Sequence, residues 1–168
     1  MRLRPIAALV VAATVIGIGA AWWVTSRQPV TLASGTALEA PRRIGAFRLT
    51  DHRRKPTAPG VELGGAIRVV FLGVDPARDT AERLAGYVGH FNPRFVAVTG
   101  ARAEIDALCR DLGIAYVQNP GAGGDYTVDH SAALVLIDPR ARVAGYFQPP
   151  HDSDALAADL AALADGAG

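Results

Sequence analysis

Apolar and polar positions along the middle of the chain follow the periods of alternating strands and helices. Two short apolar runs, 67–72 and 95–99, are typical of strands buried on both faces of a parallel sheet. The segment between them predicts a helix over 80–91, because its apolar residues recur at helical spacing. A second helix is predicted over 101–112, and Gly113 is placed to end it.

The C-terminal third predicts further strands and one more helix. Short apolar segments at 115–118, 131–137 and 143–147 read as strands, and the last two form a hairpin around an Asp-Pro-Arg turn. A final helix is predicted over 153–164, and a short strand at 47–50 precedes the whole series. From residue 67 onward the order is β-α-β-α-β-β-β-α, which predicts an α/β sandwich.

The apolar faces of the two central helices can be predicted residue by residue. Asp79 and Glu82 have the spacing of a capping box, which predicts that Asp79 caps the first helix. Four residues at i, i+3, i+4 and i+7 give that helix one apolar face: Leu84, Tyr87, Val88 and Phe91. The corresponding face of the second helix consists of Ile105, Leu108, Cys109 and Leu112.

A long apolar run lies ahead of this domain, at residues 5–24. It has one polar interruption, and a helix of about 20 residues spans the hydrocarbon core of a bilayer. Trp22 and Trp23 end the run, where indole rings favour the membrane–water interface. Arg2 and Arg4 precede it, so the positive-inside rule keeps the N-terminus in the cytoplasm. We therefore expect a single-pass anchor in the cytoplasmic membrane and a domain on its outer, periplasmic side.

These features divide the chain into three parts. Residues 1–25 are the predicted transmembrane anchor, 26–46 a linker, and 47–165 the folded domain. The linker prediction depends on Pro and Gly residues with little periodicity. The alternative for the apolar run is a cleaved signal peptide, whose small residues at 19–21 would suit a peptidase. Either alternative exports the domain.

Composition and charge exclude several functions. The 168 residues carry a net charge of +1, without the basic patch that nucleic-acid binding requires. The single cysteine, Cys109, excludes a disulfide within the chain. No phosphate-binding glycine loop, nucleophile elbow or zinc signature is present in the sequence. We expect a protein that is not an enzyme.

Four segments carry candidate motifs, of which the second and the fourth are not explained by generic α/β patterning. They are Phe47–His52 (FRLTDH), Val74–Thr80 (VDPARDT), Phe95–Gly100 (FVAVTG) and Asp125–Ser131 (DYTVDHS). Their order and spacing resemble the SCO/SenC family of thioredoxin-fold proteins. The resemblance implies a domain that binds copper through a Cys-x-x-x-Cys loop and one distant histidine. It also implies a role in loading the copper centre of cytochrome c oxidase, or in thiol redox chemistry there.

The sequence departs from this family at the cysteine loop. Phe71-Leu72-Gly73 runs directly into Val74-Asp75-Pro76, where the family has the Cys-x-x-x-Cys turn, a helix and another strand. The expected fold is therefore a thioredoxin-like α/β sandwich that lacks one β-α unit and follows one transmembrane helix.

The resemblance assigns a possible role to few residues. His130 corresponds to the family's copper-binding histidine, and it is our weak candidate for a metal ligand. The alternative is an imidazole that braces the loop before Ser131. Cys109 is predicted to face the core, although a redox thiol is its functional alternative. Asp75, Arg78 and Asp79 are candidates for docking a partner, against a structural alternative of helix capping and an ion pair.

These expectations lead to one main hypothesis and three alternatives. The main hypothesis is a partner-binding accessory factor of cytochrome c oxidase biogenesis whose copper binding is lost or weakened. Its partners would be the membrane, through residues 5–24, and an oxidase subunit or copper-handling protein. The alternatives are a copper chaperone that combines His130 with a partner's thiolates, a redox protein acting through Cys109, and a non-functional remnant. Copper is possible by resemblance, but tight binding is not expected because Cu(I) prefers thiolates.

Overall fold

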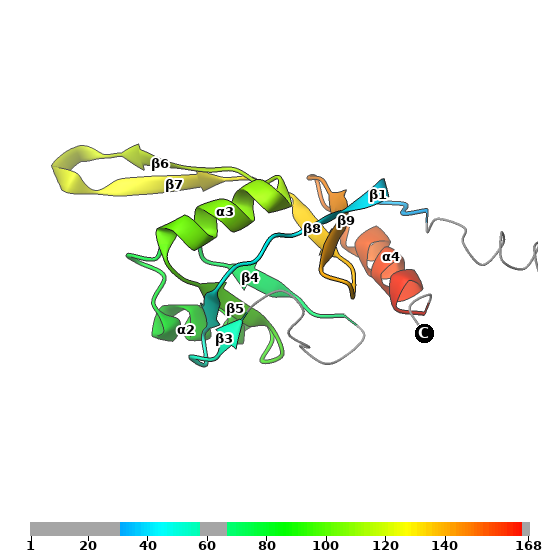
Figure 1. The fold of residues 1–168 in the computed structure, drawn as a ribbon, viewed down its shortest axis with the longest axis horizontal. Coiled ribbons are helices and arrows are strands. Elements are labelled where there is room, and N and C mark those ends of the chain that lie inside the picture. The colour runs from blue at the N-terminus through cyan, green and yellow to red at the C-terminus, as the bar shows by residue number, and fades with distance from the viewer. Residues whose placement is uncertain (1–30, 58–66, 166–168) are drawn as a thin grey trace, which may run out of the picture. The chain divides into compact units, whose positions relative to one another are not determined.

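The computed structural model describes residues 31–57 and 67–165, which form two main sheets, one hairpin and three helices (Figure 1). The first sheet has four strands in the order β3-β2-β5-β4. β4 runs parallel to β5, whereas β2 pairs antiparallel with both β5 and β3. The bounds are β2 Leu49–Asp51, β3 Pro56–Thr57, β4 Val70–Leu72 and β5 Val96–Thr99.

Helices α2 (Ala81–Phe91) and α3 (Arg102–Leu112) cover opposite faces of β5 (Figure 1). Alternate residues of a strand point to opposite faces, and β5 follows this rule. Val96 and Val98 belong to the core that α3 closes, whereas Ala97 packs under α2. The sheet is thus the middle layer between two helices, as the β-α-β-α pattern predicted.

A second sheet has the order β1-β9-β8 and is antiparallel throughout. Its strands are β1 Thr36–Arg43, β8 Leu134–Ile137 and β9 Arg142–Phe147. The predicted hairpin is confirmed in β8 and β9. Val143 of β9 is fully buried in the same cluster as Val96, Val98 and the inner face of α3, so one core links the two sheets.

Strand β1 corrects the prediction for residues 26–46. We expected a linker there, but Thr36–Arg43 pairs with β9 and forms an edge of the second sheet. Most of its side chains are exposed, so the sequence lacks the apolar alternation that marks a half-buried strand. Backbone pairing with β9 forms this strand, and backbone pairing leaves little signal in the sequence.

The hairpin β6–β7 also differs from the prediction. β6 (Tyr116–Pro120) was expected as a shorter strand, and β7 (Tyr126–His130) was not predicted as a strand. The two pair antiparallel through five residue pairs, and the short 3-10 turn η1 (Ala122–Gly124) joins them. β7 is polar at Thr127, Asp129 and His130, which hides its strand character in the sequence.

The helix predictions are confirmed, with one correction at a cap. α4 (Ser153–Asp165) is present, and α3 ends where Gly113 takes a left-handed conformation with φ of 68°. All four residues predicted for the inner face of α3 are buried. Thr80, not Asp79, caps α2, because its side chain accepts the backbone N–H of Arg83.

Strand β4 is less buried than predicted. We expected residues 67–72 to be covered on both faces, but Val70 is 44% exposed and Phe71 is 38% exposed. The outer half of the predicted apolar face of α2 is also open, with Tyr87 at 51% and Phe91 at 62%. The reason is topological: among the described residues, β4 has a neighbouring strand, β5, on one side only.

Among residues 31–57 and 67–165, no helix has the length and apolar character needed to cross a membrane. The predicted anchor at residues 5–24 lies outside this described part of the chain.

Candidate functional site

The turn between β4 and α2 holds a buried carboxylate, Asp75. This residue is 4% exposed and is the Asp of the Val-Asp-Pro motif. Arg78 donates to its Oδ2 through Nε at 2.5 Å, and the Tyr126 hydroxyl lies 3.0 and 2.9 Å from the two carboxylate oxygens. The guanidinium of Arg78 also stacks 4.0 Å from the Tyr126 ring centroid and donates to the Tyr126 carbonyl at 2.9 Å. Three side chains thus join the turn to β7.

Burial and hydrogen bonding act in opposite directions on the pKa of Asp75. Burial alone would raise its pKa, but the hydrogen bonds from Arg78 and Tyr126 and the charge of Arg78 hold it below its ordinary value. The pKa of Tyr126 is raised, first because its hydroxyl donates to the Asp75 carboxylate and then by burial. Asp75 is therefore ionised, and Tyr126 is a neutral hydrogen-bond donor, at neutral pH.

The three docking candidates lie together, but they differ in what they offer a partner. Asp75 points inward, whereas the Arg78 side chain is 39% exposed. Asp79 accepts the backbone N–H of Asp75 at 3.0 Å and so helps to shape the turn. The ion pair of the structural alternative is present, between Arg78 and Asp75. Of the three, Arg78 is the group best placed to meet another molecule.

Tyr126 is the member of this cluster that sequence reasoning missed. It stands in the DYTVDHS motif, but its contact with Asp75 bridges 51 positions of the chain. A parallel cluster lies at the base of the same hairpin, where the Tyr116 hydroxyl donates to Asp106 and accepts from Arg102. The signal available for Tyr126 was its place in the DYTVDHS motif. Its contact with Asp75 could not be predicted from one sequence.

His130 ends β7 and is exposed. Its Nδ1 lies 3.0 Å from the Ser131 carbonyl oxygen. Because a carbonyl can only accept, this contact is a hydrogen bond in the tautomer that carries its proton on Nδ1, and in that tautomer Nε2 has the lone pair. The bracing role of the structural alternative is therefore present, and one nitrogen is still suited to a metal ion.

The other residues do not complete a copper site around His130. Cys109 is 4% exposed and lies in the core cluster under β5 and β9. Burial, with a smaller contribution from Asp106, raises the pKa of its thiol, so the thiolate that binds metals or attacks disulfides is disfavoured. In the described ranges 31–57 and 67–165, no three His, Cys, Asp or Glu side chains converge on a point that could hold a metal ion. This donor set does not fit a thiolate-rich copper site.

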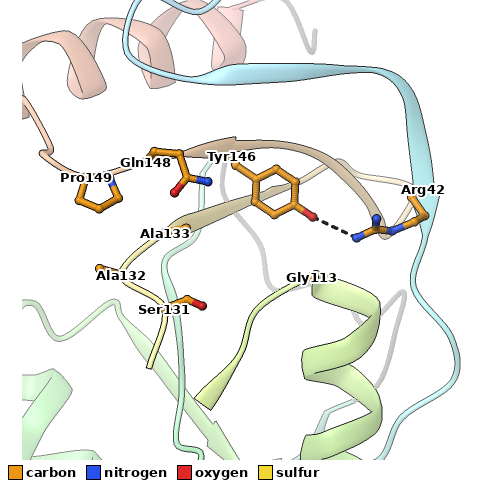
Figure 2. Close-up of a pocket in the computed structure, with 8 residues that line it drawn as sticks. All are labelled: Arg42, Gly113, Ser131, Ala132, Ala133, Tyr146, Gln148 and Pro149. Carbon is orange, nitrogen blue, oxygen red and sulfur yellow. Dashed lines mark hydrogen bonds between the residues drawn. The ribbon is translucent and has the colours of Figure 1, made fainter. Parts of the chain in front are cut away.

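A surface pocket of about 530 Å³ lies beside the C-terminus of α3 (Figure 2). Two of its polar side chains already have structural partners: Arg42 donates to the Asp111 carbonyl and the Tyr146 hydroxyl, and Tyr146 donates to the Leu112 carbonyl. They satisfy the carbonyls that the helix end leaves free. The lining residues are Arg42, Gly113, Ser131, Ala132, Ala133, Tyr146, Gln148 and Pro149.

The sequence profile described as SCO1/SenC matches residues 55–165. The chain belongs to the SCO1/SenC family. Two relatives are the mitochondrial SCO1 homolog 1 of Arabidopsis thaliana and the mitochondrial SCO1 homolog of Homo sapiens. The first is 34% identical over 52% of this chain and 26% of its own length, and the second is 37% identical over 55% and 31%. The matched region thus spans about a third or less of these two relatives.

Solved structures of SCO proteins have the same thioredoxin-like fold as this SCO1/SenC chain. ScoI of Bradyrhizobium japonicum with copper bound is 25% identical, with a TM-score of 0.63 over 72% of this chain and 99% of the other. Apo Sco1 of Thermus thermophilus is 22% identical, with a TM-score of 0.66 over 79% and 97%. The predicted family and its mixed α/β fold are therefore confirmed.

Proposed function

We propose that this SCO1/SenC protein is a membrane-anchored accessory factor of cytochrome c oxidase biogenesis that binds a partner and has lost or weakened copper binding. The observation that carries the proposal is the donor set. The family's domain and motifs are kept, while the one cysteine of the chain is buried in the core. Partner recognition needs the surface of the domain, whereas metal transfer needs the thiolate ligands. A protein that keeps the fold and lacks the thiolates can therefore still bind a partner.

The two sheets support the loss of one β-α unit. β4 is an edge of the four-stranded sheet, and β8 is an edge of the three-stranded one. Both edges carry exposed apolar residues, among them Val70 and Leu134, at 44% and 45%. A strand inserted at these edges would cover such residues. We infer that the strand that leads into the family's Cys-x-x-x-Cys loop is the one that is absent.

The remaining parts of the proposal follow from the chain's own residues. The apolar run 5–24 would hold the protein in the cytoplasmic membrane with its domain on the periplasmic side. Arg78, held over Tyr126 by its ion pair with Asp75, would contact the partner. The protein would act by binding and not as an enzyme, since its one thiol is buried.

A Cu(I) titration under anaerobic conditions tests the lost-copper part of the proposal. The full chain, purified in detergent, is expected to bind Cu(I) weakly or not at all, because the imidazole of His130 alone supplies too few soft ligands. His130→Ala is expected to remove any weak binding, and His90→Ala, which changes an exposed histidine on α2, is the matched control. Tight stoichiometric binding that depends on His130 would overturn this part.

Deleting the gene tests the biogenesis part. The expected result is a lower copper content and activity of the cytochrome c oxidase assembled in the cell. Normal copper loading and activity would contradict the proposal. Complementation with His130→Ala is expected to restore oxidase, whereas a charge reversal at the partly exposed Arg78, Arg78→Glu, is expected to restore it poorly.

A second candidate function, a copper chaperone that shares its metal with a partner's thiolates, is favoured by the free Nε2 lone pair of His130. It predicts Cu(I) binding in the complex alone, and loss of that binding in His130→Ala. Binding by the complex that is the same in His130→Ala and the unchanged chain would exclude this alternative.

A further inference from the structure

The two main sheets have four edge strands among the described residues, and these edges differ in how well they are protected from pairing. An unprotected edge pairs readily with another chain, and proteins prevent this with charged residues, proline or a β-bulge. β3 begins with Pro56, and β1 carries Pro41, Arg42 and Arg43 beside an irregularity in its register with β9. The edges of β3 and β1 are therefore suited to face solvent.

The other two edges, those of β4 and β8, have no such protection. β4 has the sequence Val70-Phe71-Leu72 and β8, Leu134–Ile137, has the sequence LVLI, so neither strand contains a charge or a proline. The β8–β9 register is also irregular, but the extra residue is Ala144 on β9. Edges of this composition are prone to aggregate when they stay exposed to water. The contrast with β3 and β1 indicates that β4 and β8 are covered when the protein works.

The open side of β4 offers backbone groups to an incoming strand. The Val69 carbonyl accepts from Val96 and the Gly73 N–H donates to the Val98 carbonyl, so these groups are directed toward β5. Backbone groups alternate along a strand, which turns those of Val70 and Leu72 to the other side. Among residues 31–57 and 67–165, no strand pairs with that side of β4.

The edges of β4 and β8 border the same core. Leu72 of β4 and Val135 of β8 both pack against the buried cluster that includes the inner face of α3. Val70 lies on the same side of β4 as Leu72 and is 44% exposed. Phe71 lies on the opposite side and is 38% exposed, with its ring centroid 4.9 Å from that of Tyr87 on α2. A strand placed beside β4 would therefore pack alternate side chains next to the α3 core and next to α2.

We propose that one extended segment of a partner protein pairs with β4 and β8 at the same time, in the place of the strand that this chain lacks. The segment would be about as long as β8, which has four residues. It would be uncharged, free of proline and rich in β-branched or aromatic residues. Main-chain hydrogen bonds would hold it, and its alternate side chains would give specificity. The inference rests on the proposed function in one respect, that the protein acts by binding a partner.

The two open edges favour such a segment over other occupants. An occupant that pairs with β4 and β8 together must have both of its own edges free, which the edge strand of a folded sheet in a second copy does not. Residues 58–66 of this chain, which lie outside the described part, contain Glu62 and four Gly or Pro residues, a composition that suits an uncharged strand poorly. Residues 5–24 belong to the membrane in the proposed function.

Amide hydrogen exchange of the full chain in detergent, followed by NMR, tests the pairing at β4. The probe is the peptide acetyl-Lys-Thr-Val-Ile-Val-Phe-Thr-Lys-amide, whose terminal lysines keep it soluble. The amides of Val70 and Leu72 should exchange rapidly in the free chain and about tenfold or more slowly with saturating peptide. The amide of Gly73, already bonded to Val98, should be protected in both states. The same peptide with proline in place of its isoleucine is the control and should protect neither residue.

Two substitutions test the edges separately, with affinity measured by the fluorescence anisotropy of labelled peptide. Leu134→Lys places a charge on the β8 edge, and Val70→Pro removes an outward N–H of β4 without touching the bonds to β5. Each is expected to weaken peptide binding about tenfold or more while the circular dichroism is kept. Val117→Lys, at a residue 58% exposed on β6, is the control that leaves the affinity unchanged.

Three results would each overturn the inference. The first is protection of Val70 and Leu72 in the free chain, which would mean that this chain or a second copy covers the edge. The second is a peptide that leaves both amides unprotected, and the third is equal affinity in Leu134→Lys, Val70→Pro and Val117→Lys. The gene deletion separates this inference from the proposed function: normal oxidase contradicts the proposed function alone, whereas an oxidase defect with unprotected amides contradicts this inference alone.

Discussion

Asp75 shows how a residue of the SCO1/SenC motif can be structural in this chain. Its carboxylate is almost completely buried and receives hydrogen bonds from Arg78 and Tyr126. A buried charge is stable when it is paired and hydrogen-bonded, and it is costly when a partner is lost. The cluster therefore ties the β4–α2 turn to β7 and holds Arg78 in the position proposed for partner contact.

Asp75→Asn is expected to lower the free energy of unfolding by roughly 1–3 kcal/mol at neutral pH, because Arg78 and Tyr126 lose a charged acceptor. The folded-state pKa of Asp75 lies below its ordinary value of 3.8, so its contribution is fully present above that value. The contribution is lost as the pH falls through the lower, folded-state pKa. The difference between variant and unchanged chain should therefore shrink in acid.

Urea unfolding at neutral pH and at several pH values below about 4 measures this difference. Asp154→Asn, at an exposed position on α4, is the control and should change little at any pH. A gap between Asp75→Asn and the unchanged chain that stays constant into acid would contradict the assignment of the lowered pKa to Asp75.

At the residue scale, the sequence identified the residues that shape the turn between β4 and α2, but some of the roles predicted for them were wrong. The ion pair of Arg78 was anticipated, but the cap of α2 is Thr80, one position after the predicted Asp79. Neighbouring polar residues compete for the same cap. Asp79 is instead used by the backbone N–H of Asp75, a contact set by the path of the turn.

At the scale of elements, the end of α3 combines a local signal with two distant ones. Gly113 takes the left-handed conformation, and its N–H reaches the carbonyls of Arg110 and Cys109. The next carbonyls are satisfied from elsewhere, Asp111 by Arg42 of β1 and Leu112 by Tyr146 of β9. Glycine at this position could be read from the sequence, but Arg42 and Tyr146 could not.

Gly113→Ala is expected to destabilise the protein by about 1–2 kcal/mol, the usual cost of a left-handed conformation for a residue with a Cβ. The added Cβ would also lie 3.0 Å from the Tyr146 hydroxyl and 3.3 Å from Nη2 of Arg42, so both capping contacts would shift. Thermal unfolding checks this prediction.

Gly89→Ala is a matched control for this change. Gly89 lies inside α2, and a Cβ there would meet no atom within 4 Å. Alanine should stabilise that helix by up to about 1 kcal/mol. If both variants melt at the same temperature, the left-handed strain at Gly113 is not what sets the end of α3.

At the scale of the whole described domain, Asp159 connects the start of the domain to its last helix. It is 6% exposed, and its carboxylate accepts the backbone N–H groups of Ala33 and Ser34 at 2.8 Å and the Ser34 hydroxyl at 2.7 Å. These hydrogen bonds, led by the one from Ala33, hold the pKa of Asp159 below its ordinary value. In the sequence, Asp159 lies among the regularly spaced apolar residues of the last helix, and a charged residue in such a helix would be predicted to face solvent.

Asp159→Ala is expected to free the segment 31–35 from α4 and to destabilise the domain, because two partly buried N–H groups lose their acceptor. Limited proteolysis should then cut this segment faster than in the unchanged chain. Asp154→Ala, on an exposed position of the same helix, is the control. Equal cleavage rates in Asp159→Ala and the control would show that Asp159 does not hold the segment 31–35 against α4.

The sequence by itself determined the local elements and the family. Periodicity was sufficient for α2, α3, α4 and the β8–β9 hairpin, because each buries one regular apolar face. The motifs from Val74 and Asp125 were specific enough to indicate the SCO/SenC family, and the single cysteine limited its copper chemistry from the start.

The tertiary structure decided which surfaces are covered and which polar groups meet. β1 and β7 exist because a neighbouring strand pairs with them, and such pairing leaves no mark on polar side chains. Val70, Phe71 and Tyr87 look like core residues in the sequence, and β4 has no second neighbour among the described residues to bury them. Whether a side chain is buried depends on which element packs against its strand or helix. The sequence shows which residues form an apolar face, but it does not show what covers that face.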